Sequence, residues 1–389
     1  MASTPLPVRR RLTWRWLIRS VTLVLAAGIV AWLLLPVSPL LTERLYSTGI
    51  YPQIARVLIP ITSAVPFSIT GSLLIALPLI FVVSVVRSWH QHYDYKHQQV
   101  EQKQVTRLSW LVMWLERLIT SLVIIAGLFL FMWGLNYNRL ALEEVLALSD
   151  YQASQEDLEA LSEHLLSIMQ HTQREAGVRT PAEVDAALQA GRTSLQTVIG
   201  QLTNQYVTLP KQPKYTMPGL LMRSGNAIGV VSPWLLEAHV DGALPAPFAL
   251  TVSLHEFVHL AGYAGEADAD FLAAVAGLRA DNPLMRYSTA LNLFRSLAWR
   301  LPQSSYREFY DQLPEQAQTD LSERRAVSAR YRVPRWFQSA QIRVYDSYLR
   351  AQGVEAGIAD YGRMVNWLTQ AHARGLLADS PLVPVVNIR

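Results

Sequence analysis

Residues 255–270 read His-Glu-Phe-Val-His-Leu-Ala-Gly-Tyr-Ala-Gly-Glu-Ala-Asp-Ala-Asp, and this stretch carries most of the recognisable chemistry of the chain. His255 and His259 are four residues apart, so on a helix their imidazoles share one face and can bind one zinc ion. Glu256 follows the first histidine, and in this HExxH arrangement a glutamate acts as general base toward a metal-bound water. The apolar flanks within residues 248–260 predict a buried helix. The stretch therefore predicts a Zn²⁺ site on a helix inside a folded domain.

The third zinc ligand is predicted downstream of the two histidines, because a catalytic zinc binds three protein side chains and a water. Gly262 ends the helix and lets the chain turn back, and Glu266 opens a new helix, EADADFLAAVAGL. We assign Glu266 as the third ligand. Asp270 lies one turn later on the same face, where it accepts the other ring N–H of a ligand histidine. Asp268 is the alternative third ligand, although it points to a different side of that helix.

A simpler interpretation of the same residues is a helix with two hydrogen-bonded core histidines, followed by a solvated acidic turn. The zinc site is favoured because the motif falls on a predicted helix, a glycine turn follows it, and carboxylates come within reach. Imidazole and carboxylate groups that are buried also need a metal ion or polar partners.

Three long apolar runs occupy the first third of the chain, at about 16–37, 66–87 and 117–136, and each is near the roughly 20 residues that cross a bilayer. The N-terminal tail has five arginines and the 87–117 loop has five basic residues, whereas the 38–65 loop has two. By the positive-inside rule the tail is cytoplasmic, and the third span exports the remainder of the chain. We therefore expect a multi-pass protein of the bacterial cytoplasmic (inner) membrane, with its C-terminal domain extracytoplasmic.

Composition agrees with this division of the chain. Of 389 residues 51% are hydrophobic and 16% charged, against roughly 25% charged in soluble proteins, which argues against a purely soluble enzyme. The absence of cysteine excludes thiolate zinc sites and cysteine nucleophiles. The net charge of +4 divides into +8 in residues 1–136 and −4 in the remainder. Because the basic excess lies in the predicted membrane part, we expect no nucleic-acid partner.

The expected fold is mainly α. Residues 1–136 form a membrane anchor of three transmembrane helices, and 137–389 form an α-rich metallopeptidase domain. Capping boxes at Ser154 and Thr180 predict two helix starts, and successive helices extend from about residue 248 to 375.

A short β hairpin or bent edge strand is predicted where two apolar segments flank Ser224-Gly-Asn226. Its second half is expected to pair with an extended substrate. The residues assigned to this strand are Ile228, Gly229, Val230 and Val231.

The site segment resembles the gluzincin pattern, HExxH followed by ExxxD, as in thermolysin-like and CAAX-prenyl-type membrane peptidases. It is most similar to a family of bacterial membrane proteins catalogued as a domain of unknown function, whose segment reads approximately HELAHQxGxxxExEAN behind a few N-terminal spans. The similarity extends from Pro210 to about Leu368. It implies a zincin-like fold with His255, His259 and Glu266 on zinc and Glu256 as base.

Three residues depart from the pattern of that family. Asp270 stands where the family has Asn, which keeps a hydrogen-bond acceptor, and Asp268 stands where it has Glu, which shortens the reach of the carboxylate. Leu260 stands where the family has Gln, so any role of that Gln is lost. The gap from His259 to Glu266 is also shorter than in most gluzincins.

The predicted function is that of a membrane-anchored zinc metallopeptidase, in which a zinc-activated water hydrolyses a peptide bond and Glu256 is the general base. The expected partners are a peptide or protein substrate in the cell envelope and the lipid bilayer. The alternative is a catalytically inactive zincin-like scaffold or binding protein in the membrane. Tyr263, Tyr287 and His239 are candidate oxyanion donors. The substrate and the oligomeric state do not follow from the sequence.

Overall fold

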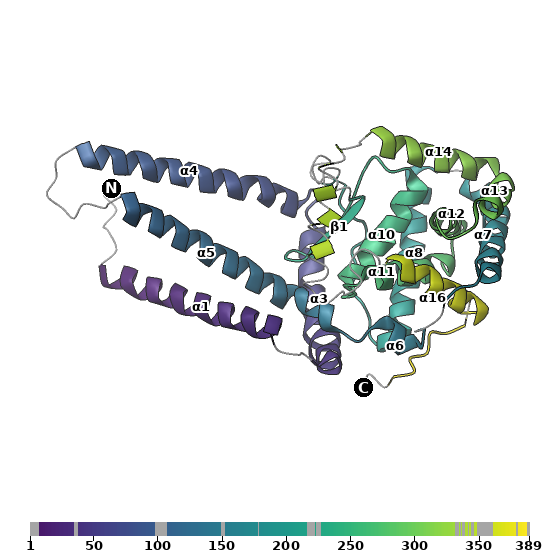
Figure 1. Ribbon diagram of the computed structural model, residues 1–389, viewed down its shortest axis with the longest axis horizontal. Helices are drawn as coiled ribbons and strands as arrows, with labels where there is room; N and C mark the ends of the chain where they lie inside the picture. Colours follow the sequence, from purple (N-terminus) through teal and green to yellow (C-terminus); the bar gives the residue numbers. More distant parts are fainter. Residues whose placement is uncertain are drawn as a thin grey trace. The chain divides into compact units, whose positions relative to one another are not determined.

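The computed structural model (Figure 1) describes most of the chain and divides it into two compact units, 1–37 with 72–134 and 38–71 with 135–389. The residues described are 8–34, 38–97, 107–148, 152–177, 179–215, 222, 227–330, parts of 334–347, 361–378 and 380–386. The chain is mainly α with one two-stranded antiparallel sheet, as expected.

The helices and strands occur in a simple order along the chain. They are α1 (Val8–Leu34), α2 (Pro39–Leu41), the π-helix η1 (Thr42–Ile50), α3 (Tyr51–Ser63), α4 (Ile69–His97), α5 (Arg107–Met132), η2 (Gly134–Asn138), α6 (Leu142–Leu146), α7 (Gln155–Ala176), α8 (Pro181–Thr203), β1 (Gly229–Ser232), β2 (Glu237–Val240), α10 (Ala246–Leu260), α11 (Glu266–Leu278), α12 (Pro283–Leu297), α13 (Gln303–Asp311), α14 (Glu315–Arg330) and α16 (Tyr361–Ala373).

Two helices are long and apolar enough to cross a membrane, and three were expected. Within the described residues these candidate spans are Ile69–His90 and Leu111–Met132, in α4 and α5. The first predicted span, 16–37, contributes only the shorter apolar helix Arg19–Ala31. This helix begins at Arg19, and residues 35–37 of the predicted span lie outside the described part. Among the described residues, the expected three spans are therefore corrected to two candidate spans.

α10 occupies the centre of the second unit, where it contacts α8, α11, α12 and the hairpin. Leu254, Phe257 and Val258 have no exposed surface, which confirms the buried helix predicted around the HExxH motif. Because apolar side chains point outward on every side, the helix is buried by neighbours all round.

The two predicted capping boxes are present and begin α7 and α8. Thr180 accepts a hydrogen bond from the Glu183 backbone, and the Glu183 carboxylate accepts one from Thr180 N in return. Ser154 and Asp157 exchange the same pair of bonds. Each cap satisfies backbone N–H groups that the first turn of a helix leaves open.

The hairpin pairs β1 with β2, which lies after it in the chain, and Val230 stands opposite His239. The predicted hairpin around Ser224-Gly-Asn226 falls largely outside the described residues, and its second half is β1. On the other side of β2, Lys214 N donates to Ala238 O and Val240 N donates to Lys214 O. Within the described part of the chain, β1 is therefore the edge strand.

Residues 38–71 belong by their contacts to the second unit, although the sequence pattern placed them in the anchor. Arg139 forms a buried ion pair with Glu43, 2.6 Å between Nη2 and Oε1. Tyr51 donates its hydroxyl to Leu260 O at 2.7 Å. These buried polar contacts join η1 and α3 to the residues around the HExxH helix.

Candidate metal centre

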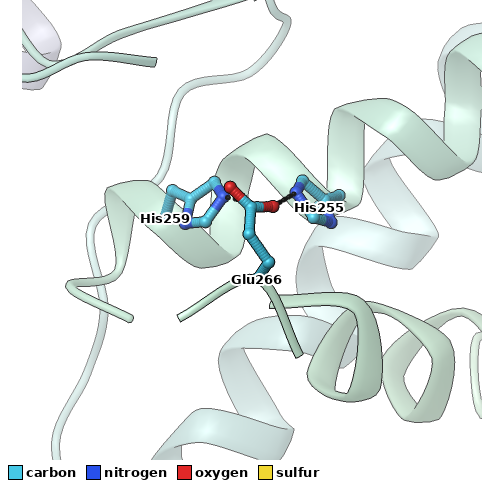
Figure 2. Close-up of side chains that lie close together, drawn as sticks. All are labelled: His255, His259 and Glu266. Carbon is cyan, nitrogen blue, oxygen red and sulfur yellow. Dashed lines mark ion pairs between the residues drawn. The ribbon is translucent and has the colours of Figure 1, made fainter. Parts of the chain in front are cut away.

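Three predicted ligands converge between the end of α10 and the start of α11 (Figure 2). Glu266 Oε2 lies 3.2 Å from His255 Nε2 and 3.7 Å from His259 Nε2. One ligand atom from each of the three residues lies within 4.8 Å of the others. Two imidazole nitrogens and a carboxylate oxygen form a donor set suited to zinc.

The second nitrogen of each imidazole is held by an acceptor. His255 Nδ1 lies 2.7 Å from Asp270 Oδ1, and His259 Nδ1 lies 2.7 Å from Tyr263 O. Because Nδ1 is held by an acceptor in both rings, Nε2 is the atom that each ring turns toward Glu266; it donates to the carboxylate when protonated and can bind a metal ion when deprotonated. Asp270 thus stands at the position predicted for it from the sequence.

The ionisable groups of this cluster shift one another's pKa values. Burial alone would raise the pKa of Glu266, but hydrogen bonds from His255 and His259 hold it well below its usual value. Burial would likewise lower the pKa of His255, yet the Asp270 and Glu266 carboxylates raise it well above the ordinary value. In this buried site the charged carboxylates and imidazoles thus stabilise one another against the cost of burial.

The turn between the two helices brings Glu266 back to the histidines. α10 ends at Leu260, and Gly262 adopts a φ of +89°, a conformation that side chains with a Cβ rarely tolerate. A Cβ at this position would also meet the Tyr51 ring at 3.0 Å. Gly262 therefore reverses the chain at the predicted position.

Glu256 lies beside the three converging residues and is 4% exposed. Burial raises the pKa of its carboxyl to about 7, an effect that the neighbouring His255 and His259 oppose. Its Oε2 accepts no hydrogen bond from the described residues, which is unusual for a buried polar atom. An acceptor held in this way is available to a molecule that enters the site.

β1 passes directly over Glu256. A Cβ on Gly229 would lie 2.2 Å from Glu256 Oε1 and 2.6 Å from Val252 Cγ1, so only glycine fits between the strand and the helix. Asp241 N donates to Ile228 O, which places Ile228 among the residues that bond toward β2. Because bonding alternates along an antiparallel strand, Gly229 and Val231 direct their backbone groups away from β2, to an edge that is unpaired among the described residues. Gly229, one of the four predicted edge-strand residues, thus borders the site.

Asp268 is not brought to the histidines. Its Oδ2 lies 3.0 Å from the point where a Cβ on Gly265 would stand, at the start of α11. Its negative charge acts on Arg139 and Tyr263, whose pKa values it helps to raise. The geometry favours Glu266 over Asp268 as the third ligand.

The candidate oxyanion donors have other partners. Tyr287 is fully buried and donates to Asp320 at 2.7 Å, within a core polar network. His239 Nε2 lies 2.8 Å from Ser68 Oγ. The Arg139 guanidinium carbon stands 3.7 Å over the ring of Tyr263.

The residues that support the turn at Gly262 were not predicted from the sequence. Arg139 donates through Nη1 to Gly262 O at 2.7 Å while it binds Glu43 with Nε and Nη2. Tyr51 supports the end of α10 from the other side, through Leu260 O. The sequence did contain one indication of this ion pair: Glu43 is the single acidic residue between residues 38 and 71.

A family model described as "Protein of unknown function (DUF3810)" matches residues 46–369, most of the chain. The match includes both candidate spans and the site, and it begins much earlier than the similarity expected from Pro210. No curated protein and no solved structure matches the chain.

Proposed function

The chain belongs to the family of proteins of unknown function DUF3810, and we propose that it is a membrane-anchored zinc metallopeptidase. The observation that carries this proposal is the convergence of His255, His259 and Glu266 beside a buried Glu256 whose Oε2 has no partner among the described residues. We further propose that it lies in the bacterial cytoplasmic membrane with this site outside the cytoplasm, because the five basic residues of the 87–117 loop indicate that the connection between the two candidate spans is cytoplasmic.

The side chains fit a zinc ion. His255, His259 and Glu266 would hold it, since each offers one atom to a common point and the imidazoles are oriented by Asp270 and Tyr263 O. Bound zinc would supply a Lewis acid for the substrate carbonyl and lower the pKa of the attacking water. The His255 side chain is 17% exposed and that of Glu266 11%, so a substrate can approach.

The protein groups around this point serve peptide hydrolysis. Glu256 accepts a proton from the attacking water as the water oxygen bonds to the carbonyl carbon, and it returns that proton to the nitrogen as the C–N bond breaks. The edge of β1 that faces away from β2 offers backbone groups to an extended peptide, which would align the scissile bond beside Glu256. An inactive scaffold would need neither a buried acceptor nor a strand edge that lack partners in the described part of the chain.

Zinc content tests the ligand assignment. Wild type is expected to bind about one zinc ion per chain, and the variants His255→Ala, His259→Ala and Glu266→Ala to lose it, because a three-ligand site cannot spare a donor. Asp270→Ala is expected to weaken binding by about 10–100-fold, because His255 loses the acceptor that orients its ring. The measurement is competition with a chromophoric chelator on the full chain in detergent.

Asp268→Asn is the matched control for these ligand variants, since it removes a carboxylate from the same helix. We expect it to keep its zinc. Loss of zinc from Asp268→Asn together with retention by Glu266→Ala would contradict our assignment and favour Asp268.

Gly229→Ala tests the position of β1. The added Cβ overlaps Glu256 Oε1, so either the strand or the carboxylate must shift, and kcat/KM for peptide cleavage is expected to fall by about a hundredfold. Gly242→Ala is the control, because its Cβ would meet nothing closer than Tyr215 at 3.8 Å. Equal activity in the two variants would show that the approach of β1 to Glu256 plays no part in catalysis.

A further inference from the structure

We propose that the exposed face of η1 and α3, which belong to the second unit, lies in the headgroup region of the lipid bilayer. A row of apolar side chains, here called the apolar stripe, is exposed along η1 and α3 and at their two ends, in α2 and just before α4. The stripe consists of Leu41, Leu45, Ile50, Val57, Ile61 and Phe67.

The stripe is one of two apolar faces on the same segment. Its central members are largely exposed, Leu45 at 64%, Val57 at 63% and Ile61 at 60%. On the opposite face Tyr51 and Ile59 are each 1% exposed, packed into the second unit. Spacings of four residues, as from Val57 to Ile61, keep the stripe on one side of the helix. A helix that is apolar on both faces needs a second apolar surface.

Chain connectivity indicates which surface that is. α3 ends at Ser63, and α4, which opens the candidate span Ile69–His90, begins six residues later. The last member of the stripe, Phe67, comes directly before this span. At the other end of the segment, α2 follows closely on the apolar helix α1. A segment attached so closely to a membrane helix stays at the bilayer surface.

The charges of the segment fit anionic headgroups. The exposed charged side chains between residues 38 and 71 are Arg44 and Arg56, and the single acid, Glu43, is buried against Arg139. An apolar face bordered by basic residues is typical of helices that lie within the membrane interface. A second copy of the chain would find no negative charge on this segment to pair with its own arginines.

The inner face of the segment carries the contacts to the metal centre. Tyr51 binds Leu260 O, and Glu43 holds the Arg139 that donates to Gly262 O. If this segment binds the bilayer, it would therefore hold the turn at Gly262, between α10 and α11, at the membrane surface.

Fluorophore labelling tests this interface directly, because the chain has no cysteine of its own. The variants Leu45→Cys, Val57→Cys and Ile61→Cys are labelled with a polarity-sensitive dye in the full chain, reconstituted in phosphatidylcholine–phosphatidylglycerol vesicles. Trp299→Cys is the control, since Trp299 is an apolar residue that is 90% exposed and lies outside the stripe. Quenching by lipid-attached nitroxides is compared with quenching by aqueous iodide.

The three stripe labels are expected to be quenched several-fold more by the lipid-attached nitroxides than by iodide, and the Trp299→Cys label to show the reverse. Stripe labels that iodide quenches as well as it quenches the control would overturn the proposal. Labels that neither agent quenches would overturn it too, because the stripe would then be covered by protein, such as a second copy of the chain. The result does not depend on zinc or on peptidase activity.

Discussion

Glu256→Gln is expected to lower kcat/KM for peptide hydrolysis by about 10²–10⁴-fold, the usual contribution of a positioned general base. The glutamine keeps the shape of the side chain and fits beneath Gly229, so the fold should be retained. Its amide oxygen is too weak a base to take the proton from water. Zinc should remain bound, because Glu256 is not one of the three converging donors. Peptide cleavage and zinc content are measured on the same preparation.

The control for this variant is Glu144→Gln, the same exchange at an exposed position on α6. It should keep wild-type activity. Full activity in Glu256→Gln would show that another group is the base. If Glu256→Gln lost zinc together with its activity, Glu256 would be acting in metal binding, contrary to the role proposed for it.

Arg139→Met is expected to reduce the free energy of unfolding of the second unit by about 3–5 kcal/mol, the cost of breaking a buried ion pair from one side. The two side chains are 6% and 2% exposed, and the variant leaves the Glu43 carboxylate buried without its partner. Gly262 O loses a donor in addition. The change in the free energy of unfolding is measured by pulse proteolysis in urea, on the full chain in mild detergent.

Two further variants isolate the buried charge as the cause. Arg363→Met breaks an ion pair with Glu143 in which the side chains are 46% and 24% exposed, and it should cost about 1 kcal/mol or less. The double variant Glu43→Leu/Arg139→Met should be destabilised less than Arg139→Met, because no lone charge remains. If Arg139→Met and Arg363→Met had equal effects, the Arg139–Glu43 pair would not support the fold in the way proposed.

The features that local sequence predicts well are those that neighbouring residues determine. The helix around His255, the reversal at Gly262 and the helix beginning at Glu266 each depend on side chains within a few positions, and the structure contains all three. The capping box at Thr180 is another example, since donor and acceptor are three residues apart. Helix signals of this kind need no knowledge of distant partners.

Contacts between distant segments were not predicted. β2 reads Glu-Ala-His-Val, a polar-apolar alternation that indicates one exposed face, yet all four residues are buried. Glu237 is buried because it accepts hydrogen bonds from Ile69 N and Thr70 N, at the beginning of α4. The Arg139–Glu43 pair likewise joins residues 96 positions apart. Nothing in the local pattern of either segment identifies such a partner.

The central claim is that His255, His259 and Glu266 hold a zinc ion at which peptides are hydrolysed. Its most direct test is cleavage of a peptide library by the full chain in lipid, first stripped by a chelator and then titrated with zinc. We predict that cleavage is absent after stripping and returns in proportion to zinc, reaching its maximum at about one ion per chain. Zinc bound at that ratio with no peptide cleaved, or cleavage that persists after stripping, would contradict the claim.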